Sequence, residues 1–127
     1  MIVGMGIDLI EIDRIAELLQ RKPTFVQRIL TDKERELLPK GDRRSLEYIA
    51  GRFAAKEAAA KALGTGIGAH VGFQDIEVLR EDNGAPFLRI KQEVLAARYG
   101  LLQTPVCHLS ISHSDTYAIA QVILEQA

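Results

Sequence analysis

The chain has 127 residues, of which 47% are hydrophobic and 26% charged, and its net charge is −1, so it is neither disordered nor strongly basic. Residues 1–4 lack the basic region of a secretory leader, so we expect none, and no apolar run reaches the roughly 18 residues that a membrane span needs. The single cysteine, Cys107, excludes an intramolecular disulfide. We therefore expect one cytoplasmic domain over residues 1–127, with no linker or repeat.

The first predicted elements are a strand and three short helices. Residues 2–12 read as a buried strand, and Asp13 is placed to cap a helix that stops before Pro23. Residues 24–27 and 31–34 both fit the capping-box pattern. They predict two further short helices that begin just after each threonine.

The longest predicted helix runs from about residue 44 to 63, because its apolar residues recur at helical spacing. Gly64 stands where a left-handed cap would end it. The apolar stripe consists of Leu46, Ile49, Phe53, Ala60 and Leu63.

The remaining predicted elements are mostly strands. Residues 76–79 and 86–90 flank an Asn-Gly pair and read as a hairpin, and a helix over 91–99 ends at Gly100. Two closing strands cover 106–112 and 117–124. The order predicts an α+β fold whose sheet is mainly antiparallel.

Charged residues are distributed unevenly along the chain. Residues 14–44 hold nine Lys and Arg against five Asp and Glu, a balance of +4, and the rest of the chain holds seven against twelve, a balance of −5. A basic segment in an acidic chain argues against general nucleic-acid binding. It suits a compact acidic partner or phosphates, and an ordinary solvated helix face is the alternative.

Two acids could share a metal ion. Asp8 interrupts an apolar strand, where an unpaired charge is costly to bury, and Glu57 lies on the long helix four residues before Lys61. Mg²⁺ usually takes one or two carboxylates and completes its shell with water and substrate phosphates, which Lys61 could contact. The alternatives are a surface ion pair between Glu57 and Lys61, and a helix cap or an arginine partner for Asp8.

Other motifs match no known site. Loop 64–68 could offer backbone N–H groups to a phosphate, but it fits neither the P-loop nor GxGxxG, and Gly4-x-Gly6 is likewise an incomplete dinucleotide fingerprint. Ser112-His113 lacks the GxSxG elbow of a hydrolase. No histidines have metal-binding spacing, and His113, expected in a turn, is the best of them for a role in a site.

Three segments together resemble one family. They are residues 6–15 (GIDLIEIDRI), residues 52–58 with 61–66 (RFAAKEA and KALGTG), and residues 109–114 (LSISHS). They strongly resemble the bacterial holo-[acyl-carrier-protein] synthases, the small 4′-phosphopantetheinyl transferases. The resemblance spans essentially the whole chain, with no departure at the metal positions.

The resemblance implies a fold and a reaction. The fold is that of the 4′-phosphopantetheinyl transferases, with an antiparallel-dominated sheet packed on one long helix and several short helices. The reaction transfers the 4′-phosphopantetheine of coenzyme A to a serine of apo acyl carrier protein, in fatty acid biosynthesis, and releases adenosine 3′,5′-bisphosphate. A homotrimer with its site at the subunit boundary is also implied.

The resemblance assigns residues as well. Asp8 and Glu57 would bind Mg²⁺ at the pyrophosphate of the coenzyme, and Lys61 would complete the catalytic set at the same phosphates. The serine proton could pass to Glu57, to a water held by the ion, which we favour, or to an acid of the carrier. Expected coenzyme contacts are Arg43 and Arg44 at the 3′-phosphate, and Lys61, Gly64, Thr65, Gly66, Ser112 and His113. Expected docking residues for the acidic carrier are Arg14, Arg21, Lys22 and Arg28.

Two other functions compete with this one. The first is a noncatalytic module that binds acyl carrier protein or coenzyme A through the same basic face without a metal. The second is a thioester hydrolase acting on acyl-coenzyme A, which the missing nucleophile elbow disfavours. We expect neither a nucleic-acid nor a membrane partner.

Overall fold

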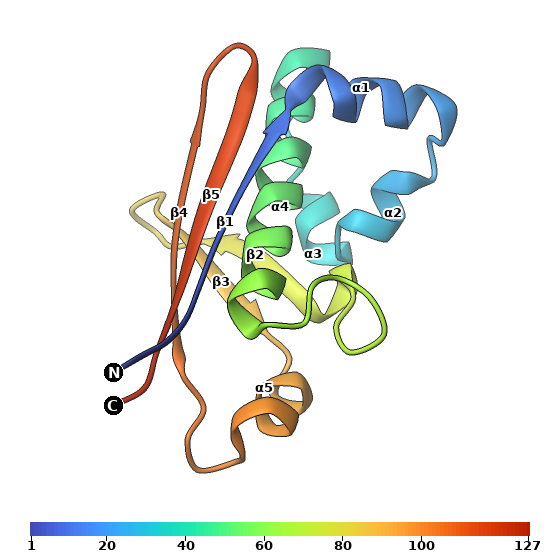
Figure 1. Cartoon of the computed structure of the whole chain (residues 1–127). Helices are drawn as coiled ribbons and strands as arrows, with labels where there is room; N and C mark the ends of the chain where they lie inside the picture. The colour runs from blue at the N-terminus through green and yellow to red at the C-terminus, as the bar shows by residue number, and fades with distance from the viewer.

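Two antiparallel sheets and five α-helices make up the computed structural model, which describes residues 1–127 (Figure 1). In chain order the elements are β1 (Ile2–Glu11), α1 (Ile12–Arg21), α2 (Phe25–Ile29), α3 (Asp32–Glu36), α4 (Asp42–Leu63), a 3₁₀ turn (Phe73–Asp75), β2 (Ile76–Arg80), β3 (Pro86–Ile90), α5 (Gln92–Tyr99), β4 (Val106–His113) and β5 (Tyr117–Glu125). The predicted α+β class is confirmed, and every predicted strand and helix is present.

The sheets lie around α4. The larger sheet has the strand order β1-β5-β4, with both pairs antiparallel, and Asp8 pairs with Ala120. β2 and β3 form a separate hairpin. Figure 1 shows the larger sheet along one side of α4 and helices α1, α2 and α3 along another. The long helix therefore runs through the middle of the molecule and contacts both layers.

β1 approaches α4 most closely at two glycines. A Cβ atom on Gly4 would lie 2.1 Å from the carbonyl oxygen of Ala62, and one on Gly6 would lie 1.9 Å from that of Ala58. Only a residue without a Cβ lets two backbones come this close. Alternate strand residues share a face, so the same approach brings Asp8 to α4. The Gly-x-Gly pattern serves packing here, and not dinucleotide binding.

The core is built on small side chains of α4. The fully buried alanines of this helix are Ala50, Ala54, Ala55, Ala58, Ala59 and Ala60. Their size lets the sheet and the other helices pack closely against the helix from more than one direction. The predicted single apolar stripe is therefore incomplete, because α4 is buried around most of its circumference.

The larger sheet buries only one of its faces. Met5, Ile7 and Leu9 are 55–59% exposed on the other face of β1, which no element of the chain covers. The predicted strand is right to within one residue, but its predicted burial is wrong for this face. We also find that no helix is both long enough and apolar enough to cross a membrane.

The helix ends test the predicted caps. The capping box of Thr31 and Glu34 is present at the start of α3, whereas Thr24 precedes α2 without any side-chain capping bond. Asp13 is not a cap, because α1 follows β1 without a break and already includes it in the first turn. Gly64 ends α4 in the left-handed region with φ of 81°, as predicted.

Candidate functional site

Asp8 and Lys61 meet where β1 packs against α4. Lys61 Nζ lies 3.1 Å from Asp8 Oδ1 and donates a hydrogen bond to the carbonyl oxygen of Ile7 at 3.0 Å. The Asp8 side chain is 16% exposed and that of Lys61 is 52% exposed. The partner of Asp8 is thus a lysine, and neither of the two alternatives considered for this acid is present. Lys61 in turn pairs with Asp8 and not with Glu57.

Glu57 lies half-buried one helical turn before Lys61 and lines the same cavity as Asp8. Burial raises the pKa of the Glu57 carboxyl, the negative charge of Asp8 raises it further, and the ammonium of Lys61 lowers it. One ammonium group therefore faces two carboxylates. This charge balance favours an additional cation next to Glu57 and Asp8.

The donor set fits a hard divalent ion. Asp8 and Glu57 offer carboxylate oxygens, which Mg²⁺ prefers. No group of three or more His, Cys, Asp or Glu side chains is placed so that it could hold a metal ion by itself. An ion held by these two acids would have two protein ligands and would take the rest of its shell from water and substrate phosphates.

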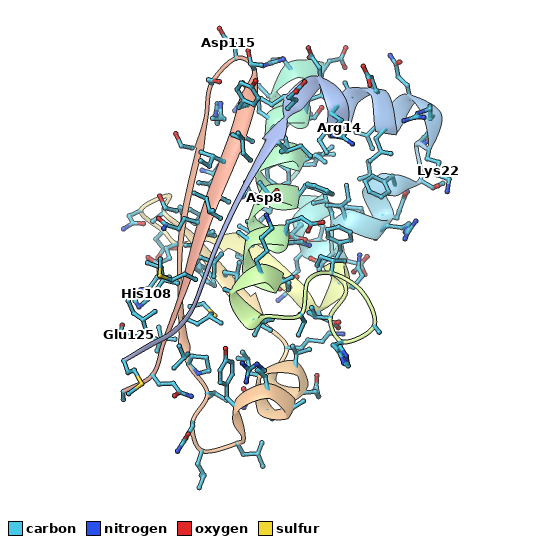
Figure 2. The ribbon with its side chains drawn as sticks, in the orientation of Figure 1. Asp8, Arg14, Lys22, His108, Asp115 and Glu125 are labelled. Carbon is cyan, nitrogen blue, oxygen red and sulfur yellow. The ribbon has the colours of Figure 1, made fainter.

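A cavity of about 700 Å³ opens beside the two acids, between β1, α1 and α4. Its lining includes Arg14 and Arg21 of α1 and Phe25 at the start of α2. Figure 2 shows Asp8 in the middle of β1, with Arg14 and Lys22 on the α1 side of the molecule. The other two predicted docking residues, Lys22 and Arg28, are exposed but do not line the cavity.

A second cavity, of about 360 Å³, collects positive charge beside a different part of α4. Its lining includes Arg44, Arg52, Arg80 and His113 together with one acid, Glu47, whose carboxylate lies 3.5 Å from His113 Nδ1. The guanidinium carbon of Arg52 lies 3.9 Å from the ring centroid of Tyr48, and its Nε, although buried, has no hydrogen-bond partner. Several unpaired guanidinium groups around one hollow suit a phosphate, and we call this hollow the anion cavity.

The anion cavity contains two predicted residues and two arginines that were missed. Arg44 and His113 are among the expected coenzyme contacts, whereas Arg52 and Arg80 are not. A signal for Arg52 exists in the sequence, because a cation among buried alanines, four residues before Lys56, needs a partner or a ligand. Arg80 has no comparable signal, since only the hairpin of β2 and β3 brings it to α4.

None of the other expected coenzyme contacts lines this cavity, although Arg43 Nε lies 3.6 Å from the carboxylate of Glu47, which does. Ser112 points to the uncovered face of the sheet, opposite to His113, so the two do not form a hydrolase pair. Arg43 donates to a carbonyl of the turn between β4 and β5. The loop 64–66 follows the far end of α4, about 30 Å from Arg44 at 1.5 Å per residue. One copy of the chain does not bring these residues together.

Comparison with known proteins identifies the family. A sequence model described as the 4′-phosphopantetheinyl transferase superfamily matches residues 4–122. The chain belongs to this superfamily. The holo-[acyl-carrier-protein] synthase of Anoxybacillus flavithermus is 51% identical over 127 residues, with 99% of this chain and 98% of that protein covered. That of Halalkalibacterium halodurans is 49% identical over the same length and with the same coverage.

Solved structures of the superfamily share the fold. A holo-(acyl-carrier-protein) synthase from Bacillus anthracis, in complex with CoA (3′,5′-ADP), is 49% identical with a TM-score of 0.84, and 100% of this chain and 99% of that one are covered. The synthase from Neisseria meningitidis is 33% identical with a TM-score of 0.87, over 98% and 99% of the two chains. The segment matched by the superfamily model contains Asp8, Glu57, Lys61 and the whole lining of the anion cavity.

Proposed function

We propose that this chain is a holo-[acyl-carrier-protein] synthase. It transfers the 4′-phosphopantetheine of coenzyme A to a serine of apo acyl carrier protein, releases adenosine 3′,5′-bisphosphate, and serves fatty acid biosynthesis. The observation that carries this proposal is that Asp8 of β1 and Glu57 of α4, far apart in the sequence, line one cavity in a chain of this superfamily. The reducing cytoplasm, where its single thiol stays free, is the proposed location.

Asp8 and Glu57 would hold Mg²⁺. The ion, when bound, would neutralise charge on the pyrophosphate of the coenzyme and the charge that develops on the 5′-phosphate of the departing adenosine 3′,5′-bisphosphate. Lys61 has a flexible stem and a half-exposed ammonium group, so it can turn from Asp8 to a phosphate oxygen of the coenzyme. Asp8 is held rigidly on a sheet strand, which fixes the position of its carboxylate relative to α4.

The anion cavity would receive the 3′-phosphate of coenzyme A. This phosphate and the pyrophosphate are attached to the same ribose. The two cavities of one chain share no lining residue, and they take different residues of α4, Arg44 and Arg52 in the anion cavity and Glu57 in the larger one. We infer that the two halves of a site come from neighbouring copies.

A homotrimer, as expected from the resemblance, would place such halves together. The uncovered face of β1 supports assembly, because Met5, Ile7 and Leu9 form an exposed apolar row that water would otherwise contact. Mass measurement in solution tests this point. A monomer at working concentration would contradict a shared site.

The acidic carrier would dock at the mouth of the larger cavity. Arg14 and Arg21 line that cavity, and Lys22 and Arg28 are exposed nearby on α2 and the turn before it. Electrostatic steering by these residues would speed capture of the carrier and weaken as salt is added. The carrier serine would then face the acids from the open side of the cavity.

The deciding experiment follows the mass of an apo acyl carrier protein incubated with this protein, coenzyme A and Mg²⁺. A gain of one phosphopantetheine group, abolished by chelator, is expected. Asp8→Asn should lose at least about 99% of transfer while the protein stays folded, because several kcal/mol of charge stabilisation disappear. Glu36→Gln, at an exposed acid of α3, is the matched control and should transfer normally.

The same experiment separates the competing functions. Carrier binding without any mass gain would support a noncatalytic module. Release of free thiol from acyl-coenzyme A, with the carrier unmodified, would support a thioester hydrolase. Near-normal Mg²⁺-dependent transfer by Asp8→Asn would refute the assignment of this acid.

A further inference from the structure

A buried ion pair lies beside α4 and contributes to neither cavity. Glu34 and Lys56 are both fully buried, and Lys56 Nζ lies 2.6 Å from Glu34 Oε1. Breaking a pair of this kind is costly, but a well-packed apolar pair of similar volume is often just as stable. Stability alone therefore does not explain the presence of Glu34 and Lys56.

Lys56 is saturated with hydrogen bonds. Its ammonium group donates to Glu34 Oε1 and to the carbonyl oxygens of Ile29 at 2.6 Å and Phe73 at 3.1 Å. These acceptors belong to α3, the end of α2 and the 3₁₀ turn before β2. The lysine thus fixes α4 to three other segments at one point.

Glu34 likewise accepts hydrogen bonds from several segments. Its carboxylate also accepts from the backbone N–H groups of Thr31 and Val78, both at 2.8 Å, so it caps α3 and joins it to β2. Its own carbonyl oxygen accepts a hydrogen bond of 2.7 Å from the hydroxyl of Tyr48. Glu34 therefore caps α3 and also holds α4, because the side chains of Lys56 and Tyr48, both on α4, bond to it.

Tyr48 connects this hub to the anion cavity. Tyr48, Arg52 and Lys56 follow one another at intervals of four residues and so share one face of α4. The ring of Tyr48 lies against the guanidinium of Arg52, which lines the anion cavity and is only 5% exposed. A displacement of α3 would move the Tyr48 ring and, with it, Arg52.

We propose that Glu34 is a positioning residue for coenzyme binding. Its carboxylate fixes α3 to Lys56 and β2, and its backbone carbonyl oxygen then holds the hydroxyl of Tyr48, whose ring keeps Arg52 in the anion cavity. This inference rests on the proposed function, since the anion is taken to be a phosphate of coenzyme A. Glu34 itself reaches no ligand, because it does not line the cavity. Lys56 neutralises its charge and fixes the angle of α4.

Charge and position make different predictions here. The negative charge of Glu34 acts on Arg52, and the positive charge of Lys56 offsets it. If the pair acted only through its charges, removing both together would leave the binding of a phosphate nearly unchanged. If Glu34 positions Arg52, removing it weakens that binding.

The test measures binding of adenosine 3′,5′-bisphosphate by calorimetry, which needs no turnover. The double variant E34Q/K56M removes both buried charges together and should remain folded, with its Kd raised by about tenfold. Tyr48→Phe deletes only the hydrogen bond to Glu34 and keeps the ring, and a loss of up to about tenfold corresponds to one such bond. Ser45→Ala, which removes a hydroxyl from an exposed bond on the same helix, is the control and should bind like the wild type.

The outcomes are distinguishable. Wild-type protein that fails to bind the nucleotide would overturn the proposed function. Wild-type protein that binds it, together with variants that bind equally well or more tightly, would overturn the positioning role while leaving the function intact. Should the double variant fail to fold, as circular dichroism would reveal, the comparison of Tyr48→Phe with Ser45→Ala decides alone.

Discussion

Replacing Gly6 with alanine should separate the strand that holds Asp8 from the helix that holds Glu57. The added Cβ would lie 1.9 Å from the carbonyl oxygen of Ala58, whereas ordinary contacts begin at 3.4 Å, so the backbones must part by about 1.5 Å. The obstructing atom belongs to a helix backbone and cannot rotate away. Overpacking typically costs about 1–3 kcal/mol, and we expect the upper end of this range.

A cost of about 3 kcal/mol leaves a domain of this size folded but lowers its melting temperature by about 10 °C. The geometry of the site should change as well, because the contacts of Lys61 with Ile7 and Asp8, 3.0 and 3.1 Å long, would be broken when β1 moves away from α4. We expect weaker Mg²⁺ binding in the presence of coenzyme A. Thermal unfolding by circular dichroism and titration calorimetry measure the two effects.

Gly51→Ala is the matched control. Its Cβ would meet only the Cγ2 of Ile111, at 3.4 Å, and the position is inside α4, where alanine is favoured over glycine by roughly 0.5–1 kcal/mol. The same substitution should therefore have opposite effects on stability at Gly6 and Gly51. A Gly6→Ala protein as stable as the wild type, with unchanged metal binding, would refute the close-approach argument.

Three further predictions concern single side chains. Burial and the charge of Asp8 raise the pKa of Glu57 in the folded protein, so ionisation of Glu57 lowers the folding stability once the pH rises above 4.5, the ordinary pKa of a glutamate. Glu57→Gln should therefore have a higher melting temperature than the wild type at pH 7.5 without metal and the same melting temperature near pH 4. It should also lose transfer. Arg21→Ala should slow capture of the carrier by up to about tenfold at low salt and leave coenzyme affinity unchanged, and equal losses in both would place Arg21 in the coenzyme site instead. Burial raises the pKa of Cys107 to about 11, so its reaction with a disulfide reagent at pH 8 should be about a hundredfold slower than that of a free thiol until the protein is unfolded.

The sequence predicted the elements well because their signals are local. The periodicity of α4, the glycine that ends it and the capping box at Thr31 each depend on residues within a turn or two of one another. Errors arose where a boundary depended on the neighbouring element. Asp13 looked like a cap, but the extended residue before α1 is Glu11, the last residue of β1, and Asp13 is already in the first turn of the helix.

The candidate site was predicted in part. A charge inside an apolar strand and an acid on the long helix singled out Asp8 and Glu57, and the structure places both at one cavity. That Lys61 would pair with Asp8 could not be read from helix spacing, which instead favoured Glu57. Their meeting depends on a strand and a helix that the sequence does not align.

The residues that were missed act through tertiary contacts. Glu34 was predicted only as a helix cap, yet it is also the partner of Lys56 and the acceptor of the Tyr48 hydroxyl. Arg80 reaches the anion cavity because the hairpin folds against α4. No local pattern describes such contacts, since the residues involved lie far apart in the chain.

The position of β1 at one edge of its sheet has a consequence for how the protein matures. Its only sheet partner is β5, and Asp8 pairs with Ala120, so this strand cannot dock in the sheet until almost the entire chain has left the ribosome. Pairings between such remote segments form slowly. Until then the nascent chain exposes an apolar strand and has not yet fixed Asp8 beside Glu57, and it is during this interval that chaperones would be needed most.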